Sequence, residues 1–154
     1  VASPHLVAPI KRMIKREGLN KIIEVVDKDP HFWIRRCDLL FASTGTVTLE
    51  AAILGTPMIT FYTLNPITYI VARSLVRTPF IALPNIVLNR QVVPELIQSQ
   101  FTAKRLTSLA LSLLDNPPRY EKMIRDLAEV RRSLGQLGAV DRAADLILEE
   151  LATI

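Results

Sequence analysis

Short apolar runs alternate with helical patterns along the first two thirds of the chain. The apolar runs predict strands at residues 22–26, 38–42, 58–62 and 80–83. Helical patterns separate the runs at residues 31–37, 46–54 and 65–76. Because the apolar runs are continuous rather than alternating in polarity, they predict parallel strands that helices cover on both faces. The fold class is therefore predicted to be α/β, with a Rossmann-like, mostly parallel sheet of about five strands.

The two ends of the chain have a different pattern. Residues 1–4 resemble the end of a strand and lack an initiator methionine, so we expect the chain to be part of a longer protein. A helix follows, with apolar positions at Leu6, Ile10, Met13 and Ile14. From Pro94 onward the pattern predicts helices at residues 95–98, 103–114, 119–134 and 142–151. We divide the chain into a sheet-containing lobe, residues 1–102, and a helical tail, residues 103–154, that completes or bridges the lobe.

Composition narrows the class of protein. With 154 residues, 49% of them apolar, the chain has the size of one globular domain. Its longest apolar stretches fall well short of the roughly 20 residues of a membrane-spanning helix, and no signal peptide is visible. One cysteine, Cys37, and two histidines argue against a disulfide or a zinc site and favour a reducing compartment. The net charge of +4 is compatible with phosphate-bearing ligands or an anionic membrane surface, but requires neither.

Candidate chemistry lies where the second predicted strand meets the next helix, in the segment Ser43-Thr-Gly-Thr-Val-Thr-Leu-Glu50. Such a junction presents backbone N–H groups and a helix N-terminus, which suit a diphosphate. Gly45 would let the backbone approach the anion, and Thr44 and Thr46 could donate hydroxyl hydrogen bonds. Glu50, one turn further on, could accept hydrogen bonds from sugar hydroxyls. The alternative is that Thr44 or Thr46 merely caps a core helix; the segment lacks the lysine of a P-loop.

Three linked motifs resemble the C-terminal domain of lipid-A-disaccharide synthases. They are DLLFASTGTVTLEAAILGTPMITFY at residues 38–62, NPITYIVARSLVRTPFIALPN at residues 65–85 and VVPELIQ at residues 92–98. The family loop usually has serine before its glycine, where this chain has Thr44, which keeps the hydroxyl. The family's N-terminal acceptor lobe and its Gly-Ser-Arg segment are not in this sequence. The resemblance therefore carries over no catalytic base, which is expected in the absent lobe.

The resemblance implies an inverting GT-B glycosyltransferase as the complete protein. Such an enzyme transfers a diacylglucosamine from UDP to diacylglucosamine 1-phosphate in a β-1,6 linkage and releases UDP, in lipid A biosynthesis. This part would bind the UDP-activated acylated glucosamine and be inactive alone, while the absent lobe holds the lipid acceptor. No cofactor or metal is expected, because helix dipoles and hydrogen bonds stabilise the leaving diphosphate. No nucleic-acid partner is expected either.

The same resemblance assigns residues to the donor. Three of them would bind the diphosphate, namely Thr44, Gly45 and Thr46. Two acids would accept hydrogen bonds from ribose or sugar hydroxyls, namely Glu50 and Glu95. Three residues would form the rim of the cleft, namely Asn85, Arg90 and Gln98. Local alternatives are that Asn85 serves the turn after Pro84, that Glu95 is a first-turn acid of a helix, and that Arg90 is solvated.

The resemblance also implies a cytoplasmic protein, peripheral to the inner face of the inner membrane, and a homodimer that exchanges C-terminal elements. The basic helix residues Lys11, Arg12, Lys15 and Arg16 could contact anionic lipid or simply be solvated. The apolar helix predicted to end at Val76 could touch a membrane or pack on the sheet. His5 and His31 have no motif that indicates catalysis. Alternative functions are another GT-B transferase lobe, a UDP-sugar epimerase lobe or a non-catalytic α/β assembly module.

Overall fold

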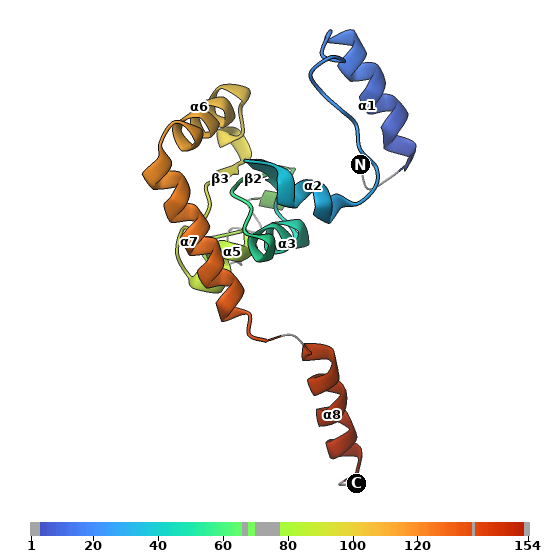
Figure 1. Ribbon diagram of the computed structural model, residues 1–154, viewed down its shortest axis with the longest axis vertical. Helices are drawn as coiled ribbons and strands as arrows, with labels where there is room; N and C mark the ends of the chain where they lie inside the picture. Colours follow the sequence, from blue (N-terminus) through green and yellow to red (C-terminus); the bar gives the residue numbers. More distant parts are fainter. Residues whose placement is uncertain (1–3, 66–67, 70–77, 137, 153–154) are drawn as a thin grey trace.

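A parallel three-stranded sheet lies at the centre of the structure, a computed structural model that describes residues 4–65, 68–69, 78–136 and 138–152. Its strands are β1 (Leu40–Ser43), β2 (Met58–Tyr62) and β3 (Glu95–Ile97), in the order β1-β2-β3 (Figure 1). Leu40 pairs with Met58 in one ladder, and Thr60 pairs with Glu95 in the other. The α/β class and the parallel sheet are thus confirmed, with three strands rather than about five in the described residues.

The crossover from β1 to β2 positions the loop that carries the candidate chemistry. Helix α3 (Thr46–Leu54) follows β1 after two loop residues. Gly55 ends the helix in the left-handed conformation, at φ 77°, which a glycine adopts without steric cost. The chain then turns directly into β2, whose first three residues are buried. Strand β1 and helix α3 therefore meet at the carboxyl edge of the sheet, where the sequence places Ser43 to Thr46.

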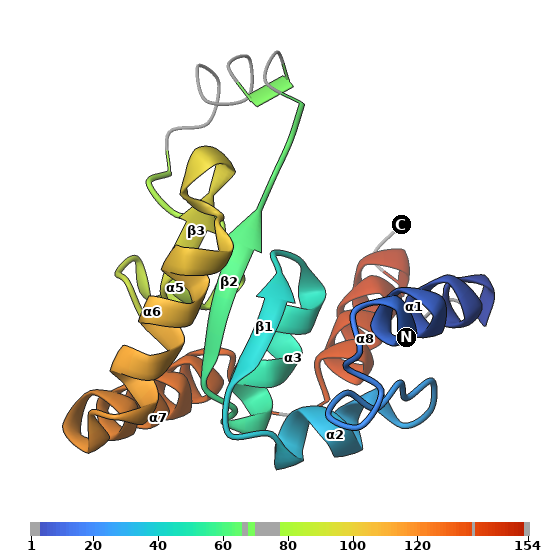
Figure 2. The same cartoon turned by 90° about the horizontal axis from the view of Figure 1, so that it is seen from above.

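Helices cover both faces of the sheet. Helices α3, α5 (Leu83–Leu88) and α7 (Pro117–Ser133) contact one another on one face, and α6 (Ala103–Leu114) contacts β2 from the opposite face (Figure 2). Helix α2 (Pro30–Arg36) packs against α3. The core between these layers is formed by large apolar side chains, including Met58, Ile59, Leu113, Leu127 and Val130. Burial of β2 from both sides explains why its sequence is continuously apolar.

Two terminal helices have little contact with this core. Helix α1 (Pro4–Arg16) and helix α8 (Ala139–Ala152) lie apart from the sheet, at opposite ends of the molecule (Figure 1). None of the residues of α1, nor residues 139–151 of α8, is buried, and α8 leaves Leu146, Ile147 and Leu148 exposed. Within the described part of the chain, no helix combines the length and the apolar composition needed to traverse a bilayer.

Three predicted elements are wrong. Residues 22–26 form a turn and coil rather than a strand, with Ile22 80% exposed, and they are not part of the sheet β1-β2-β3. Residues 80–83 are not a strand but lead into α5. Residues 95–98, predicted as a helix, form β3 and the start of a 3-10 turn, η1 (Gln98–Gln100). A short apolar run can form a helix or a strand, and its periodicity does not distinguish the two. Pairing with β2 decides which of these segments is a strand.

The other predicted elements agree with the structure to within a few residues. The helices at 46–54 and 103–114 and the strand at 58–62 have the same bounds as α3, α6 and β2. The helices at 31–37, 119–134 and 142–151 correspond to α2, α7 and α8, and the strand at 38–42 to β1. The predicted helix at 65–76 lies largely outside the described residues, as do residues 1–3 of the predicted strand end.

Candidate functional site

The loop between β1 and α3 leaves the N-terminus of α3 open. Gly45 is the N-cap residue of α3, and no side chain caps the helix there. The Thr44 N–H donates to the Phe61 carbonyl at 3.0 Å, which extends the ladder to β2 by one residue. Thr48 turns inward, and its hydroxyl donates to the Gly45 carbonyl at 2.7 Å. The alternative that Thr44 or Thr46 caps α3 is therefore wrong, and no side chain of the described residues accepts from the first N–H groups of the helix.

Gly45 faces open space. Its φ of 162° and ψ of −169° are extended values that any residue adopts, and a Cβ added there would meet no atom within 4 Å. Neither backbone strain nor packing therefore requires glycine at this position. Both Gly45 and Thr46 are exposed, and Thr44 is half-buried. The missing side chain keeps the space in front of α3 free, so an anion could approach the backbone closely.

Glu50 lies one turn along α3 and contacts a residue that the sequence did not connect with it. Its Oε2 is 3.2 Å from Nε2 of His31, at the start of α2. Both side chains are accessible, with 68% of His31 and 42% of Glu50 exposed. The two residues are separated by 19 positions, and only the packing of α2 on α3 brings them together. Because His31 has no motif around it, nothing in the sequence predicted this contact.

Asn85 lies in a different environment, fully buried near the start of α5. Its Oδ1 accepts hydrogen bonds from the N–H groups of Val92 and Val93, at 2.7 and 2.8 Å. Its Nδ2 donates to the Val93 carbonyl at 2.9 Å and to Glu95 Oε1 at 2.8 Å. The side-chain amide thus uses its two donors and two acceptor sites inside the protein. Its role extends well beyond the turn after Pro84.

Glu95 is the partner of Asn85 and lies in β3, not in the first turn of a helix. Its carboxylate accepts hydrogen bonds from the N–H groups of Ile81 and Ala82, at 3.1 and 2.8 Å for Oε1. These groups immediately precede α5, where a negative charge is favourable. We call Asn85 and Glu95 the α5–β3 junction. Both side chains are occupied by internal bonds, and their assignment to the donor stays a prediction.

Gln98 joins the chain after β2 to the end of β3. Its Oε1 accepts from the Leu64 N–H at 2.7 Å, and its Nε2 donates to the Leu64 carbonyl at 3.1 Å. The side-chain amide thereby extends the pairing of β2 and β3 beyond Tyr62 and Ile97. Gln98 has a φ of 53°, which is unfavourable for a residue with a Cβ. It follows the carboxyl end of β3, and its place at the rim of a donor site stays a prediction.

Arg90 forms ion pairs with α7. Its guanidinium is 3.1 Å from Asp126 and 2.9 Å from Glu129, so the alternative of a merely solvated side chain is wrong. Lys122 also contacts Asp126, at 2.6 Å. Burial alone would raise the pKa of Asp126, but hydrogen bonds from Arg90 and Lys122 outweigh it and lower that pKa below its usual value. Arg90 precedes the amino end of β3, whereas Gly45 follows the carboxyl end of β1.

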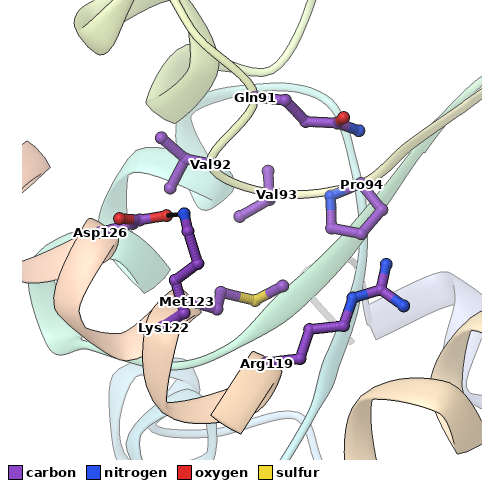
Figure 3. A pocket seen from close by; sticks show the side chains of 8 residues that line it. All are labelled: Gln91, Val92, Val93, Pro94, Arg119, Lys122, Met123 and Asp126. Carbon is purple, nitrogen blue, oxygen red and sulfur yellow. Dashed lines mark hydrogen bonds and ion pairs between the residues drawn. The ribbon is translucent and has the colours of Figure 1, made fainter.

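A cavity of about 180 Å³ lies beside this ion-pair cluster. The connection between α5 and β3 forms one wall, with Val92, Val93 and Pro94, and α7 forms the other. Figure 3 shows Lys122 meeting Asp126 at one end of the cavity and the Arg119 guanidinium near Pro94 at the other. The cavity is lined by none of the residues that the sequence assigned to the diphosphate or to hydroxyl groups.

Of the predicted residues, the structure thus groups Thr44, Gly45, Thr46 and Glu50 around the start of α3. Gln98 lies at the same edge of the sheet, at the end of β3. Asn85 and Glu95 bind each other in the α5–β3 junction, and Arg90 binds α7. A parallel sheet covered by helices on both faces, with the N-terminus of α3 open at its carboxyl edge, defines an α/β domain.

Comparison with known proteins identifies the family. The model of the lipid-A-disaccharide synthetase family matches residues 2–149, and the chain belongs to this family. It is 38% identical over 150 residues to a lipid-A-disaccharide synthase of Geobacter metallireducens, covering 97% of this chain and 36% of that protein. For the synthase of Solibacter usitatus the identity is 42%, covering 86% of this chain and 35% of the relative. The chain thus spans about a third of the length of these relatives.

Proposed function

We propose that this chain is the UDP-sugar-binding part of an inverting glycosyltransferase of lipid A biosynthesis. The complete protein would transfer a diacylglucosamine from UDP to diacylglucosamine 1-phosphate, forming a β-1,6 linkage and releasing UDP. Family membership and the names of the relatives support this proposal. The structural observation that carries it is the uncapped N-terminus of α3 behind Gly45. Since the chain spans a third of its relatives, we expect it to bind the donor without catalysing transfer alone.

The start of α3 would bind the diphosphate of the donor. Its first N–H groups have no side-chain acceptor among the described residues, and the helix dipole adds a partial positive charge at the same place. The hydroxyl groups of Thr46, an exposed residue, and Thr44, a half-buried one, could donate further hydrogen bonds. These groups would also stabilise the charge that develops on the leaving UDP, which is how such a site works without a metal ion.

Glu50 would accept hydrogen bonds from hydroxyl groups of the donor. It lies four residues beyond Thr46, which corresponds to about 6 Å along the helix axis. A ribose bonded to the diphosphate lies within that reach. Asn85, Glu95 and Gln98 would contribute to the rim chiefly by fixing the backbone at α5, β3 and Leu64, since their own polar atoms are engaged. Arg90 would reach a ligand only by opening its pairs with Asp126 and Glu129.

The partners of the complete protein are proposed on the same basis. They are an acylated UDP-glucosamine, a lipid acceptor bound by the rest of the protein, and the cytoplasmic face of the inner membrane. The exposed apolar side chains of α8 are consistent with a homodimer that forms through the C-terminal helices, and the basic residues of α1 are consistent with an anionic membrane. The family match does not favour the alternatives of an epimerase lobe, a different transferase or an assembly module.

Calorimetric titration of the chain with UDP tests the proposal, with CMP and ADP as competing nucleotides. We expect selective binding of UDP that Thr46→Ala and Glu50→Ala each weaken by roughly fivefold or more, because each removes a polar contact to the ligand. Thr107→Ala is the matched control, since Thr107 is also an exposed helical threonine but lies on α6. A chain that is folded by circular dichroism yet does not bind UDP would contradict the proposal.

A further inference from the structure

We propose that His31 is a positioning residue that orients the Glu50 carboxylate for donor hydroxyl groups. The inference rests on the function proposed above and adds to it a residue from outside the β1–α3 segment. His31 Nε2 and Glu50 Oε2 are 3.2 Å apart, within hydrogen-bonding distance. Glu50 has no other hydrogen bond or ion pair with the described residues, so its Oε1 is left to accept from a ligand. A glutamate on an open helix face has three rotatable side-chain bonds, and one anchored oxygen restricts them.

Helix α2 holds His31 in place from its other end. Ile34, 7% exposed, packs into the core, and its carbonyl accepts a 2.9 Å hydrogen bond from the buried Thr56 hydroxyl, next to the end of α3. The chain enters α2 through Asp29, in the left-handed conformation, and Pro30. These constraints fix a short helix against α3. His31 is part of this helix and not of a loop, so its ring is held beside Glu50. The pair is therefore a product of the α2–α3 packing.

The pair has the chemistry for recognising a hydroxyl group. A carboxylate accepts hydrogen bonds only, and the ribose hydroxyls of UDP are donors that a 2′-deoxyribose partly lacks. A site built to bind a hydroxyl discriminates against the analogue without it, because its own polar group is then left unpaired. If His31 orients Glu50, loss of the imidazole should weaken this discrimination. It should not weaken the binding of the diphosphate, which uses the backbone of α3.

The test is the ratio of two affinities, for UDP and for 2′-deoxy-UDP, measured by calorimetric titration of the chain. We expect the wild-type chain to prefer UDP by roughly tenfold. Glu50→Ala should abolish the preference, and His31→Ala should reduce it to about threefold or less while leaving the affinity for 2′-deoxy-UDP unchanged. His31→Gln, whose amide can also donate to Glu50, should retain most of the preference.

Thr56→Val is the control for a purely structural effect. It removes the hydrogen bond from Thr56 to the Ile34 carbonyl of α2 and does not alter Glu50. We therefore expect lower stability and an unchanged affinity ratio. The inference is overturned if His31→Ala leaves the ratio unchanged, or if it weakens both ligands equally. It is also overturned if the wild-type chain binds both nucleotides equally, although donor binding would then stand. A folded wild-type chain that binds no UDP would overturn the proposed function and this inference together.

Discussion

The start of α3 and the α5–β3 junction are both built from motifs of the same family, but they differ in the state of their polar groups. At the start of α3 the helix is uncapped, Gly45 borders open space and Glu50 is partly exposed. At the junction, Asn85 is fully buried and both it and Glu95 are bound internally. A family motif therefore contains two kinds of residue. Unsatisfied exposed polar groups suit a ligand, and saturated buried ones hold the fold.

Asn85→Ala should have the largest effect on stability. It removes an amide that satisfies two N–H groups and a carbonyl and that donates a hydrogen bond to the Glu95 carboxylate. Leaving buried groups unpaired should lower the free energy of unfolding by about 3 kcal/mol or more, as measured by urea denaturation. If the variant keeps wild-type stability but loses UDP binding, Asn85 is a ligand residue and the comparison fails.

At the start of α3, Gly45→Asp should change UDP affinity and the free energy of unfolding in opposite directions. Aspartate is a better N-cap residue than glycine, so the free energy of unfolding should rise by a few tenths of a kcal/mol. The same carboxylate would occupy and repel the proposed diphosphate site, so UDP affinity should fall by about a hundredfold. Gly45→Asn is the uncharged control and should bind UDP with an intermediate affinity. Unchanged UDP affinity in the aspartate variant would place the diphosphate elsewhere.

Asp126→Asn should reduce stability by about 1–2 kcal/mol at neutral pH, because it weakens the bonds to Arg90 and Lys122. The pKa of Asp126 is lowered in the folded protein. Its ionised form therefore contributes stability above its unfolded pKa of about 3.9, and this contribution is lost as the pH falls through the lower folded pKa. The difference between variant and wild type in urea denaturation should shrink below about pH 4. A difference that is constant from pH 7 to about pH 3 would contradict the ion-pair account.

The smallest effect is expected at Gln98, which combines an unfavourable φ of 53° with two side-chain bonds to Leu64. Gln98→Ala keeps the backbone strain and loses both bonds, which should lower the free energy of unfolding by about 1 kcal/mol. Gln98→Gly loses the same bonds but relieves the strain, so it should be more stable than the alanine variant by roughly 0.5 kcal/mol. Thermal or urea unfolding of the two variants checks the order, and the reverse order would show that the strain is not significant.

Part of the candidate site could be predicted from sequence because it is local. Ser43 to Glu50 are consecutive, and a strand followed by a glycine and a helical pattern places them at one edge of a parallel sheet. For Asn85 and Glu95, the sequence could not distinguish a ligand-binding role from a role in holding the fold. Their hydrogen bonds cross from α5 to β3. The sequence predicted a helix instead of a strand at residues 95–98, so this contact was not predicted. His31 was missed for the same reason, since its partner is on another helix.

The sequence by itself determined the α/β class, the parallel strands, the approximate bounds of most described helices and the motif that identifies the family. These properties depend on local periodicity and on consecutive residues, which neighbouring positions specify. Only the tertiary structure decided that residues 95–97 pair with β2, that residues 22–26 do not form a strand, and that Glu50 meets His31. Those outcomes depend on which distant group satisfies a backbone or side-chain hydrogen bond, and packing in three dimensions makes that choice.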